Sequence, residues 1–226
     1  MLKRVLICGL LLLAAPVLHA GEVLDRIAVT VNGHAILQSD WQDEVRYESF
    51  VAGRTLASVT PQDRKAALDR LVDQELLREQ ASTSDATQPG GTEEVEKQFA
   101  AMKDDYVRAH SSQPWSHTLA SYHLSEGDIK GHIALELSQL RLVDAHLRPS
   151  IQVDPDEIAA YYKDHLAPTN AGTQPISLQQ ATPKIRELLT QEKMNQLLSS
   201  WLESLHSQAE IRRFVPDPSD PQGSAQ

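Results

Sequence analysis

The chain has 226 residues, a formal net charge of −10 and a single cysteine, Cys8. This charge argues against nucleic acid and against anionic lipid head groups as partners, because both select basic surfaces. One cysteine forms no intramolecular disulfide, so the fold depends on packing for its stability.

Residues 1–20 are predicted to be a cleaved signal peptide. A basic start precedes an apolar run over Val5–Val17, and Ala20 offers a small residue for cleavage. A membrane anchor is the alternative, but a spanning helix needs roughly 20 apolar residues, and this run is shorter and contains Pro16. Cleavage would remove two basic residues and the cysteine, which leaves 19 Lys and Arg against 31 Asp and Glu, a net charge of −12. An exported protein without stable membrane insertion is expected.

The mature chain opens on a strand that leads into a helix. Over Asp25–Trp41 the sequence alternates as a strand, contains an Asn-Gly turn and ends in a helix start. Ser39 is expected to cap this helix, with Gln42 completing a capping box. The helix should therefore run from about Asp40 to Ala52.

Two further helices follow, and they differ in how clearly they are bounded. Thr60, with Pro61 and Asp63 behind it, gives a strong helix start. The apolar stripe of this second helix contains Leu68, Leu71, Val72, Leu76 and Leu77. Residues 82–91 form a polar connector. A third helix has an apolar face made by Val95, Phe99, Met102 and Tyr106. A loop and a short helix are expected over residues 112–125.

The second half of the chain is predicted to be three helices and a strand. Ser125 with Asp128 starts a long helix that ends at Pro149. Its core stripe is predicted to contain Ile129, Ile133, Leu137, Leu140, Val143 and Leu147. Asp154, Pro155 and Glu157 start a helix that ends near Leu166. A last helix should run from Ser177 to about Ala209, followed by a strand over Glu210–Val215 and a disordered tail over 216–226.

The predicted fold class is mainly α: about six helices with a small sheet made by N-terminal and C-terminal strands. The order of these parts resembles that of the SurA-type periplasmic chaperones and their relatives, the peptidylprolyl isomerases with a parvulin module. The opening motif is matched by Asp25, Ile27, Val29, Val31, Asn32, Gly33, Ile36, Leu37, Ser39 and Asp40. The second helix, residues 67–81, occupies the place of the family's L-x-x-L-I-x-x-x-L-L segment. A later motif is matched by Val153, Asp154, Glu157, Ile158, Tyr161 and Tyr162.

The resemblance implies how the chain is organised. Residues 21–166 would be the N-terminal chaperone region, and the helix and strand over 179–215 would return to complete the same domain. The first strand would then pair with the strand near the C-terminus. The location implied by the resemblance and the signal peptide is the periplasm.

The resemblance also shows a departure, because no room is left for a parvulin domain. Small independent domains have about a hundred residues, whereas residues 167–178 offer only twelve. This segment is interpreted as a linker. Gly131–Glu136 resembles the histidine-bearing strand of a parvulin fold, but it lies inside a helical stripe, and a helix is predicted there.

Local signatures of catalysis are missing from the sequence, so no catalytic residue is predicted. His110, His117 and His123 are close enough in sequence to suggest a metal site, but they lack the i, i+4 spacing of ligands on one helix face. The alternative, solvated or partly buried histidines, is preferred. No metal and no cofactor are predicted.

The candidate peptide-binding residues are Phe99, Met102, Tyr106, Trp115 and Tyr122. They lie in a helical insert beside a flexible connector, and methionine and aromatic side chains adapt to varied peptides. Packing in the core is the alternative for the same five residues. Core packing is also the interpretation of Trp41, Phe50, Tyr161, Tyr162 and Trp201.

The expected function is that of a periplasmic holdase for unfolded outer-membrane or secreted polypeptides. Binding would use an apolar groove between the insert and the C-terminal helix, with neither ATP nor cofactor. A peptidylprolyl isomerase with residual activity and a dedicated assembly subunit of the cell envelope are the alternatives.

Overall fold

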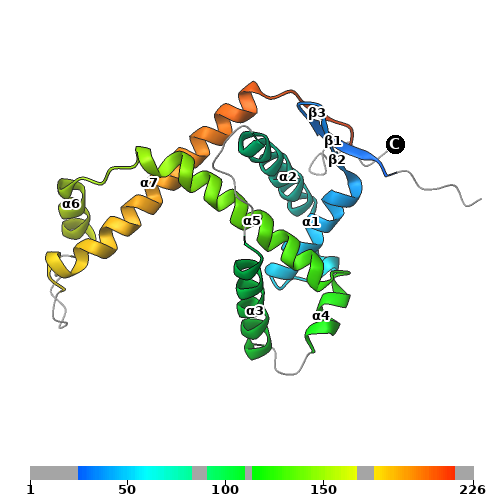
Figure 1. The fold of residues 1–226 in the computed structure, drawn as a ribbon, viewed down its shortest axis with the longest axis horizontal. Helices are drawn as coiled ribbons and strands as arrows, with labels where there is room; N and C mark the ends of the chain where they lie inside the picture. Colours follow the sequence, from blue (N-terminus) through cyan, green and yellow to red (C-terminus); the bar gives the residue numbers. More distant parts are fainter. Residues whose placement is uncertain (1–24, 83–90, 110–113, 167–175, 217–226) are drawn as a thin grey trace, which may run out of the picture.

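The computed structural model describes residues 25–82, 91–109, 114–166 and 176–216. Within these ranges the chain is mainly helical with one small antiparallel sheet (Figure 1), which confirms the predicted fold class. The α-helices described are α1 (Gln38–Val51), α2 (Pro61–Ser82), α3 (Thr92–Ala109), α4 (Trp115–Ser121), α5 (Glu126–Leu147), α6 (Pro155–His165) and α7 (Leu178–Gln208). The strands are β1 (Ile27–Val31), β2 (His34–Leu37) and β3 (Ile211–Arg213). The predicted signal peptide, most of the 167–178 linker and nearly all of the tail lie outside the described residues.

The N-terminal strand is part of a β-hairpin. β1 and β2 pair antiparallel across Asn32 and Gly33, whose φ angles are 49° and 88°. A two-residue hairpin turn with two positive φ angles matches the right-handed twist of its strands, and Asn-Gly is the pair that adopts it most readily. The turn was predicted from the sequence, but β2 was not; the structure has one strand more than expected.

The two ends of the described chain meet in the sheet, whose strand order is β2-β1-β3. β3 pairs antiparallel with β1, with Val29 opposite Arg213 and Val31 opposite Ile211. The Asn32 side chain extends this junction, because its Oδ1 accepts a 2.8 Å hydrogen bond from the Glu210 backbone N–H. The pairing of N-terminal and C-terminal strands is confirmed.

Most helix starts agree with the predicted caps. The Thr60 hydroxyl accepts from the backbone N–H of Asp63 at 3.2 Å, and Ser125 does the same for Asp128 at 3.2 Å. Such caps satisfy amide groups that have no partner within the helix.

The predicted start of α1 was wrong. The helix begins at Gln38, and the Asp40 carboxylate accepts from the backbone N–H of Leu37 at 2.8 Å. Ser39 lies within the first turn, where its hydroxyl donates to the carboxylate of Asp25. This hydrogen bond is the main cause of the lowered pKa of Asp25. Because Asp25 engages Ser39, the cap comes from the neighbouring carboxylate.

The core is divided among four clusters of buried side chains. One lies between α1, α5 and the pair α3 and α4, which we call the insert. The second lies between the sheet and α2, the third between α5 and α7, and the fourth between α6 and α7. In Figure 1, α5 crosses the middle of the molecule, and α7 runs from α6 to the sheet. This arrangement leaves faces of α1, α2 and α5 around a space that no single cluster fills.

The core stripe of α5 was predicted correctly except at Leu140. Its neighbours Leu137 and Val143 are buried, whereas Leu140 is 64% exposed. At 100° per residue these three positions lie on adjacent parts of one helix face. Leu140 is exposed because the neighbouring helices diverge there around a cavity.

Among the helices of the described ranges, none combines the length and the apolar character that crossing a membrane requires.

Candidate functional site

The structure brings the five predicted peptide-binding residues together, but as packing inside the insert. Phe99 and Trp115 are buried, and Met102, Tyr106 and Tyr122 pack against the same cluster. The Trp115 ring stands edge-on to Phe50 of α1, with 5.7 Å between the ring centroids. Such edge-to-face pairs are a favoured geometry of aromatic cores.

Polar contacts close this aromatic cluster toward solvent. The Trp115 indole N–H donates to Glu126 at 2.9 Å, and Lys103 pairs with the same carboxylate at 2.8 Å. Lys130 Nζ lies 4.8 Å from the centroid of the Phe99 ring. A peptide would therefore reach Phe99 and Trp115 only if the insert moved away from α5, and the role of these five residues in binding stays a prediction.

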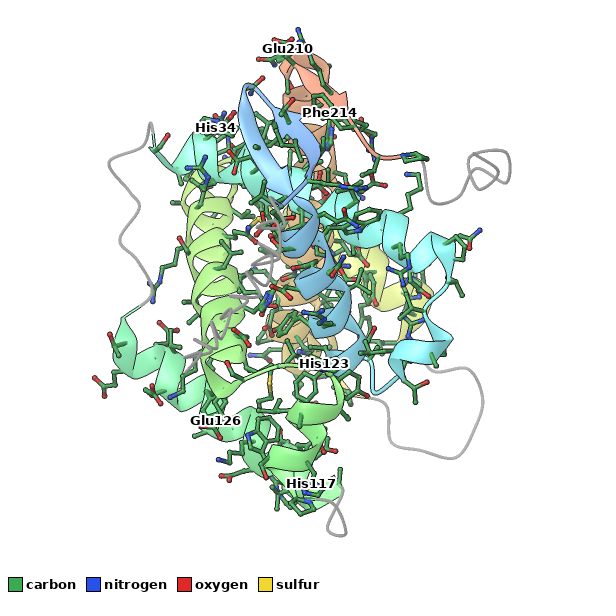
Figure 2. All side chains as sticks on the ribbon, turned by 90° about the vertical axis from the view of Figure 1, so that its right-hand side faces the viewer. His34, His117, His123, Glu126, Glu210 and Phe214 are labelled. Carbon is green, nitrogen blue, oxygen red and sulfur yellow. The ribbon has the colours of Figure 1, made fainter. Side chains whose placement is uncertain are left out.

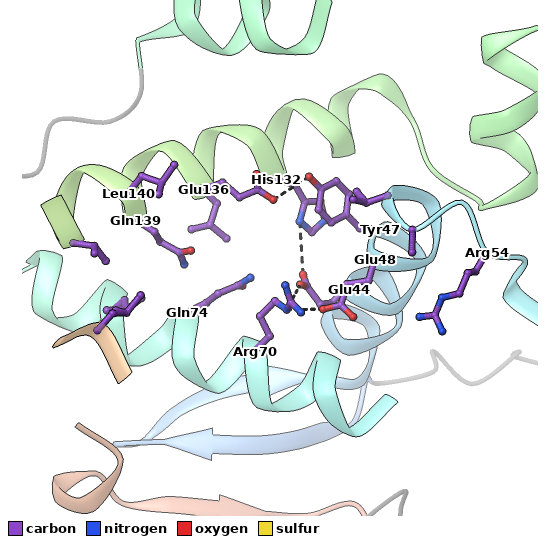
Figure 3. Close-up of a pocket in the computed structure, with 16 residues that line it drawn as sticks. Glu44, Tyr47, Glu48, Arg54, Arg70, Gln74, His132, Glu136, Gln139 and Leu140 are labelled. Carbon is purple, nitrogen blue, oxygen red and sulfur yellow. Dashed lines mark hydrogen bonds and ion pairs between the residues drawn. The ribbon is translucent and has the colours of Figure 1, made fainter. Parts of the chain in front are cut away.

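An open cavity of about 670 Å³ lies between α1, α2 and α5 (Figure 3). Its volume is within the range of sites that bind ligands, roughly 300–1,000 Å³. The C-terminal helix contributes Leu198, and no residue of the insert is among the lining residues. The cavity is therefore made by a different set of helices from the groove that was expected between the insert and the C-terminal helix.

Part of the lining of the cavity is apolar. Its lining includes Val51, Leu77, Leu135, Leu140, Val143 and Leu198. Val51 at the end of α1 is 59% exposed and Leu140 on α5 is 64% exposed. These two side chains present apolar surface that a bound segment could cover.

The centre of the cavity is polar and contains a buried carboxylate. Glu44 on α1 is only 3% exposed. Burial, followed by the charge of Glu48, raises the pKa of Glu44 to about 7. Arg70 on α2 lies between both carboxylates, with Nε 2.6 Å from Glu48 Oε1 and 3.9 Å from Glu44 Oε1. The guanidinium of Arg70 therefore interacts with both carboxylates.

The α5 side of the cavity is held by an aromatic stack and a hydrogen bond. The rings of Tyr47 and His132 are parallel, with 3.8 Å between their centroids and an interplanar angle of 4°. The Tyr47 hydroxyl donates to Glu136 at 3.0 Å, and burial raises the pKa of Tyr47. Burial also lowers the pKa of His132, so its imidazole is neutral at pH 7 and adds no positive charge.

Two buried polar atoms at the cavity lack hydrogen bonds among the described residues: Glu48 Oε1 and Gln139 Nε2. Glu48 Oε1 nevertheless has a partner, because Arg70 Nε lies 2.6 Å from it as an ion pair, so Gln139 Nε2 is the buried atom of the two that stays unpaired. Figure 3 shows Gln74 and Gln139 pointing into the space from facing helices. An unpaired buried amide of this kind is costly.

Comparison with protein-family models finds no match for this chain, and comparison with curated proteins finds none either. Neither comparison supports the resemblance to SurA-type chaperones, which stays a hypothesis based on the order of motifs.

Among the described residues, one group of three histidine and carboxylate side chains could hold a metal ion, and it lies at the hairpin. Ligand atoms of His34, Glu75 and Glu79 lie within 4.8 Å of one another. Glu79 also accepts from the Asn32 amide at 2.6 Å, and Arg78 pairs with Glu75. These contacts join the hairpin to α2. Figure 2 shows His34 near the sheet and His117 and His123 toward the opposite end, while His110 lies outside the described residues.

The residues of the polar centre were missed by the sequence analysis. A signal was present, because the charged or polar pairs Glu44 and Glu48, Arg70 and Gln74, and His132 and Glu136 each have i, i+4 spacing. Residues at that spacing share one helix face. Three such pairs on three helices, each beside an apolar stripe, indicate a polar site between the helices.

Proposed function

We propose that this protein is a periplasmic holdase chaperone that binds unfolded outer-membrane or secreted polypeptides. It does so without an isomerase module and without a cofactor. The observation that supports this proposal best is the open cavity between α1, α2 and α5, with exposed Val51 and Leu140 on its rim.

Binding is driven by removing apolar surface from water, at about 25 cal/mol per Å². Each client side chain covers only part of the rim, so each contact is weak, and many sequences satisfy it. Polar side chains of the lining, such as Gln74 and Gln139, add hydrogen-bonding groups for the peptide backbone. Release needs no chemical step, because folding of the client withdraws the same apolar side chains.

The experiment follows aggregation of a urea-unfolded outer-membrane protein, diluted into buffer with a modest molar excess of the mature chain. The unmodified chain should slow aggregation. Leu140→Glu should remove most of the effect, because a charged side chain at the rim opposes apolar burial.

Phe214→Glu is the matched control. Phe214 is also a large exposed apolar residue, at 59%, and Figure 2 shows it at the sheet end of the molecule. If the chain does not slow aggregation, the proposed function is wrong. If Phe214→Glu and Leu140→Glu weaken the effect equally, clients do not bind at the cavity.

A further inference from the structure

The charges around the cavity do not balance. Glu44, Glu48 and Glu136 line it from α1 and α5, and Glu44 senses the charges of the other two carboxylates. Arg70 is shared by Glu44 and Glu48. Among the described residues, Glu136 has no ion-pair partner, and it interacts instead with the neutral hydroxyl of Tyr47.

The other nearby cations do not correct this excess. Arg54 also lines the cavity, but its guanidinium is paired with Asp63 at 2.9 Å. His132 lies 3.7 Å from Glu44, and its lowered pKa leaves it neutral at pH 7. The lining of the cavity therefore combines an excess of carboxylates with apolar side chains.

Carboxylates beside apolar surface fit one kind of peptide side chain particularly well. Lysine and arginine carry a long apolar stem that packs on apolar surface, with a charged head at its end. The stem would lie against Leu140 or Val51, and the head would reach Glu136 or Glu48, which lie one helical turn away on the same helices. A guanidinium also offers several N–H donors, so it can pair with more than one carboxylate.

We infer that the cavity selects client segments in which an arginine or lysine is flanked by apolar side chains, with the cation paired to Glu136 and Glu48. This inference rests on the proposed function and specifies which polypeptides the cavity binds. Apolar neighbours of the cation cover the exposed side chains of Val51 and Leu140. Purely apolar segments still bind, but more weakly.

The test compares two fluorescein-labelled peptides, using fluorescence anisotropy with the mature chain. One peptide has a central arginine between apolar residues, and the other has citrulline, a neutral isostere, in its place. The arginine peptide should bind at least about tenfold more tightly, because hydrogen bonds between charged groups contribute more to binding than hydrogen bonds between neutral groups. The difference should shrink as salt rises.

Glu136→Gln should bring the two affinities close together without weakening the citrulline peptide. The amide oxygen that this substitution introduces still accepts from Tyr47, and the position is exposed, so the fold is expected to persist. Glu48→Gln should reduce the difference in affinity between the two peptides in the same way. Glu93→Gln, on the exposed start of α3, is the matched control and should keep the full difference.

The outcomes separate this inference from the proposed function. Equal binding of both peptides overturns the inference and leaves the holdase function intact. If neither peptide binds although aggregation is slowed, clients bind elsewhere and the inference is wrong; if aggregation is not slowed either, both proposals fail.

Displacement of the peptide by arginine amide at equal affinity would make the cavity a small-cation site. Self-association that Glu136→Gln abolishes would assign the cavity to a second copy of the chain. Either result overturns the inference.

Discussion

Replacing Glu44 by glutamine should stabilise the protein at alkaline pH and leave its stability nearly unchanged in acid. The pKa of this buried carboxyl is raised from 4.5 to about 7 by burial and by the neighbouring Glu48. The folded state therefore holds a proton that the unfolded state has released between these two pH values. Stability decreases as pH rises through this window, and the loss is complete above about pH 7.

The magnitude follows from the size of the shift. One pKa unit corresponds to about 1.4 kcal/mol, so this shift corresponds to about 3 kcal/mol at pH 8. At pH 4.5 the same relation leaves less than about 0.5 kcal/mol. Glutamine cannot ionise and so avoids the penalty. For a chain of this size the gain at pH 8 corresponds to an increase of about 6–12 °C in Tm.

Urea unfolding at pH 4.5 and pH 8 measures the difference, since urea adds no ions that would screen the charges. The decisive quantity is the change in the free energy of unfolding caused by Glu44→Gln at pH 8 minus that at pH 4.5. Glu93→Gln, an exposed substitution of the same type, should show little change at either pH. A loss of stability at pH 8, or an equal gain at both values, would refute the interpretation of Glu44 as a buried charge.

Two further predictions concern the hairpin turn and the alternative of isomerase activity. Gly33→Ala should lower the free energy of unfolding by about 1–2 kcal/mol, because the φ of 88° at this position disfavours any side chain. Gly131→Ala, in α5 with no atom near the added Cβ, should instead raise the free energy of unfolding by about 0.5–1 kcal/mol. Urea unfolding of both variants compares the two effects. A proline-peptide isomerisation assay should give the uncatalysed rate, because residues 167–178 are too few to form a domain; turnover that persists after contaminating isomerases are removed would contradict this.

The features that could be predicted from sequence are those determined by a few neighbouring residues. The caps at Thr60 and Ser125 are hydrogen bonds across three residues, and both were predicted correctly. The Asn-Gly turn has the same local character. The cap of α1 failed because Asp25, fourteen residues earlier, competes for Ser39. Competition between distant groups is not visible in a local pattern.

The cavity could not be predicted for a related reason. A periodic stripe shows which face of a helix is apolar, but it does not show where the neighbouring helices diverge. Leu140 has the spacing of a core residue, yet it lies where α1, α2 and α5 separate. The aromatic residues of the insert differ from Leu140 in the opposite direction. Phe99 and Trp115 were predicted to bind peptides, but they pack against α1 and α5 and are buried.

Glu44 connects the stability of the protein with its proposed binding role. A buried carboxylate that destabilises the fold by about 3 kcal/mol is a large term in a domain whose total stability is typically about 5–15 kcal/mol. Strongly shifted pKa values of this kind are concentrated at functional sites, although structural ion pairs also produce them. The burial that raises the pKa of Glu44 also strengthens its interaction with any cation that enters, because less water screens the pair. Binding of an arginine-containing peptide should therefore favour the ionised carboxylate and release a proton near pH 7, and calorimetry in two buffers of different ionisation enthalpy would detect it.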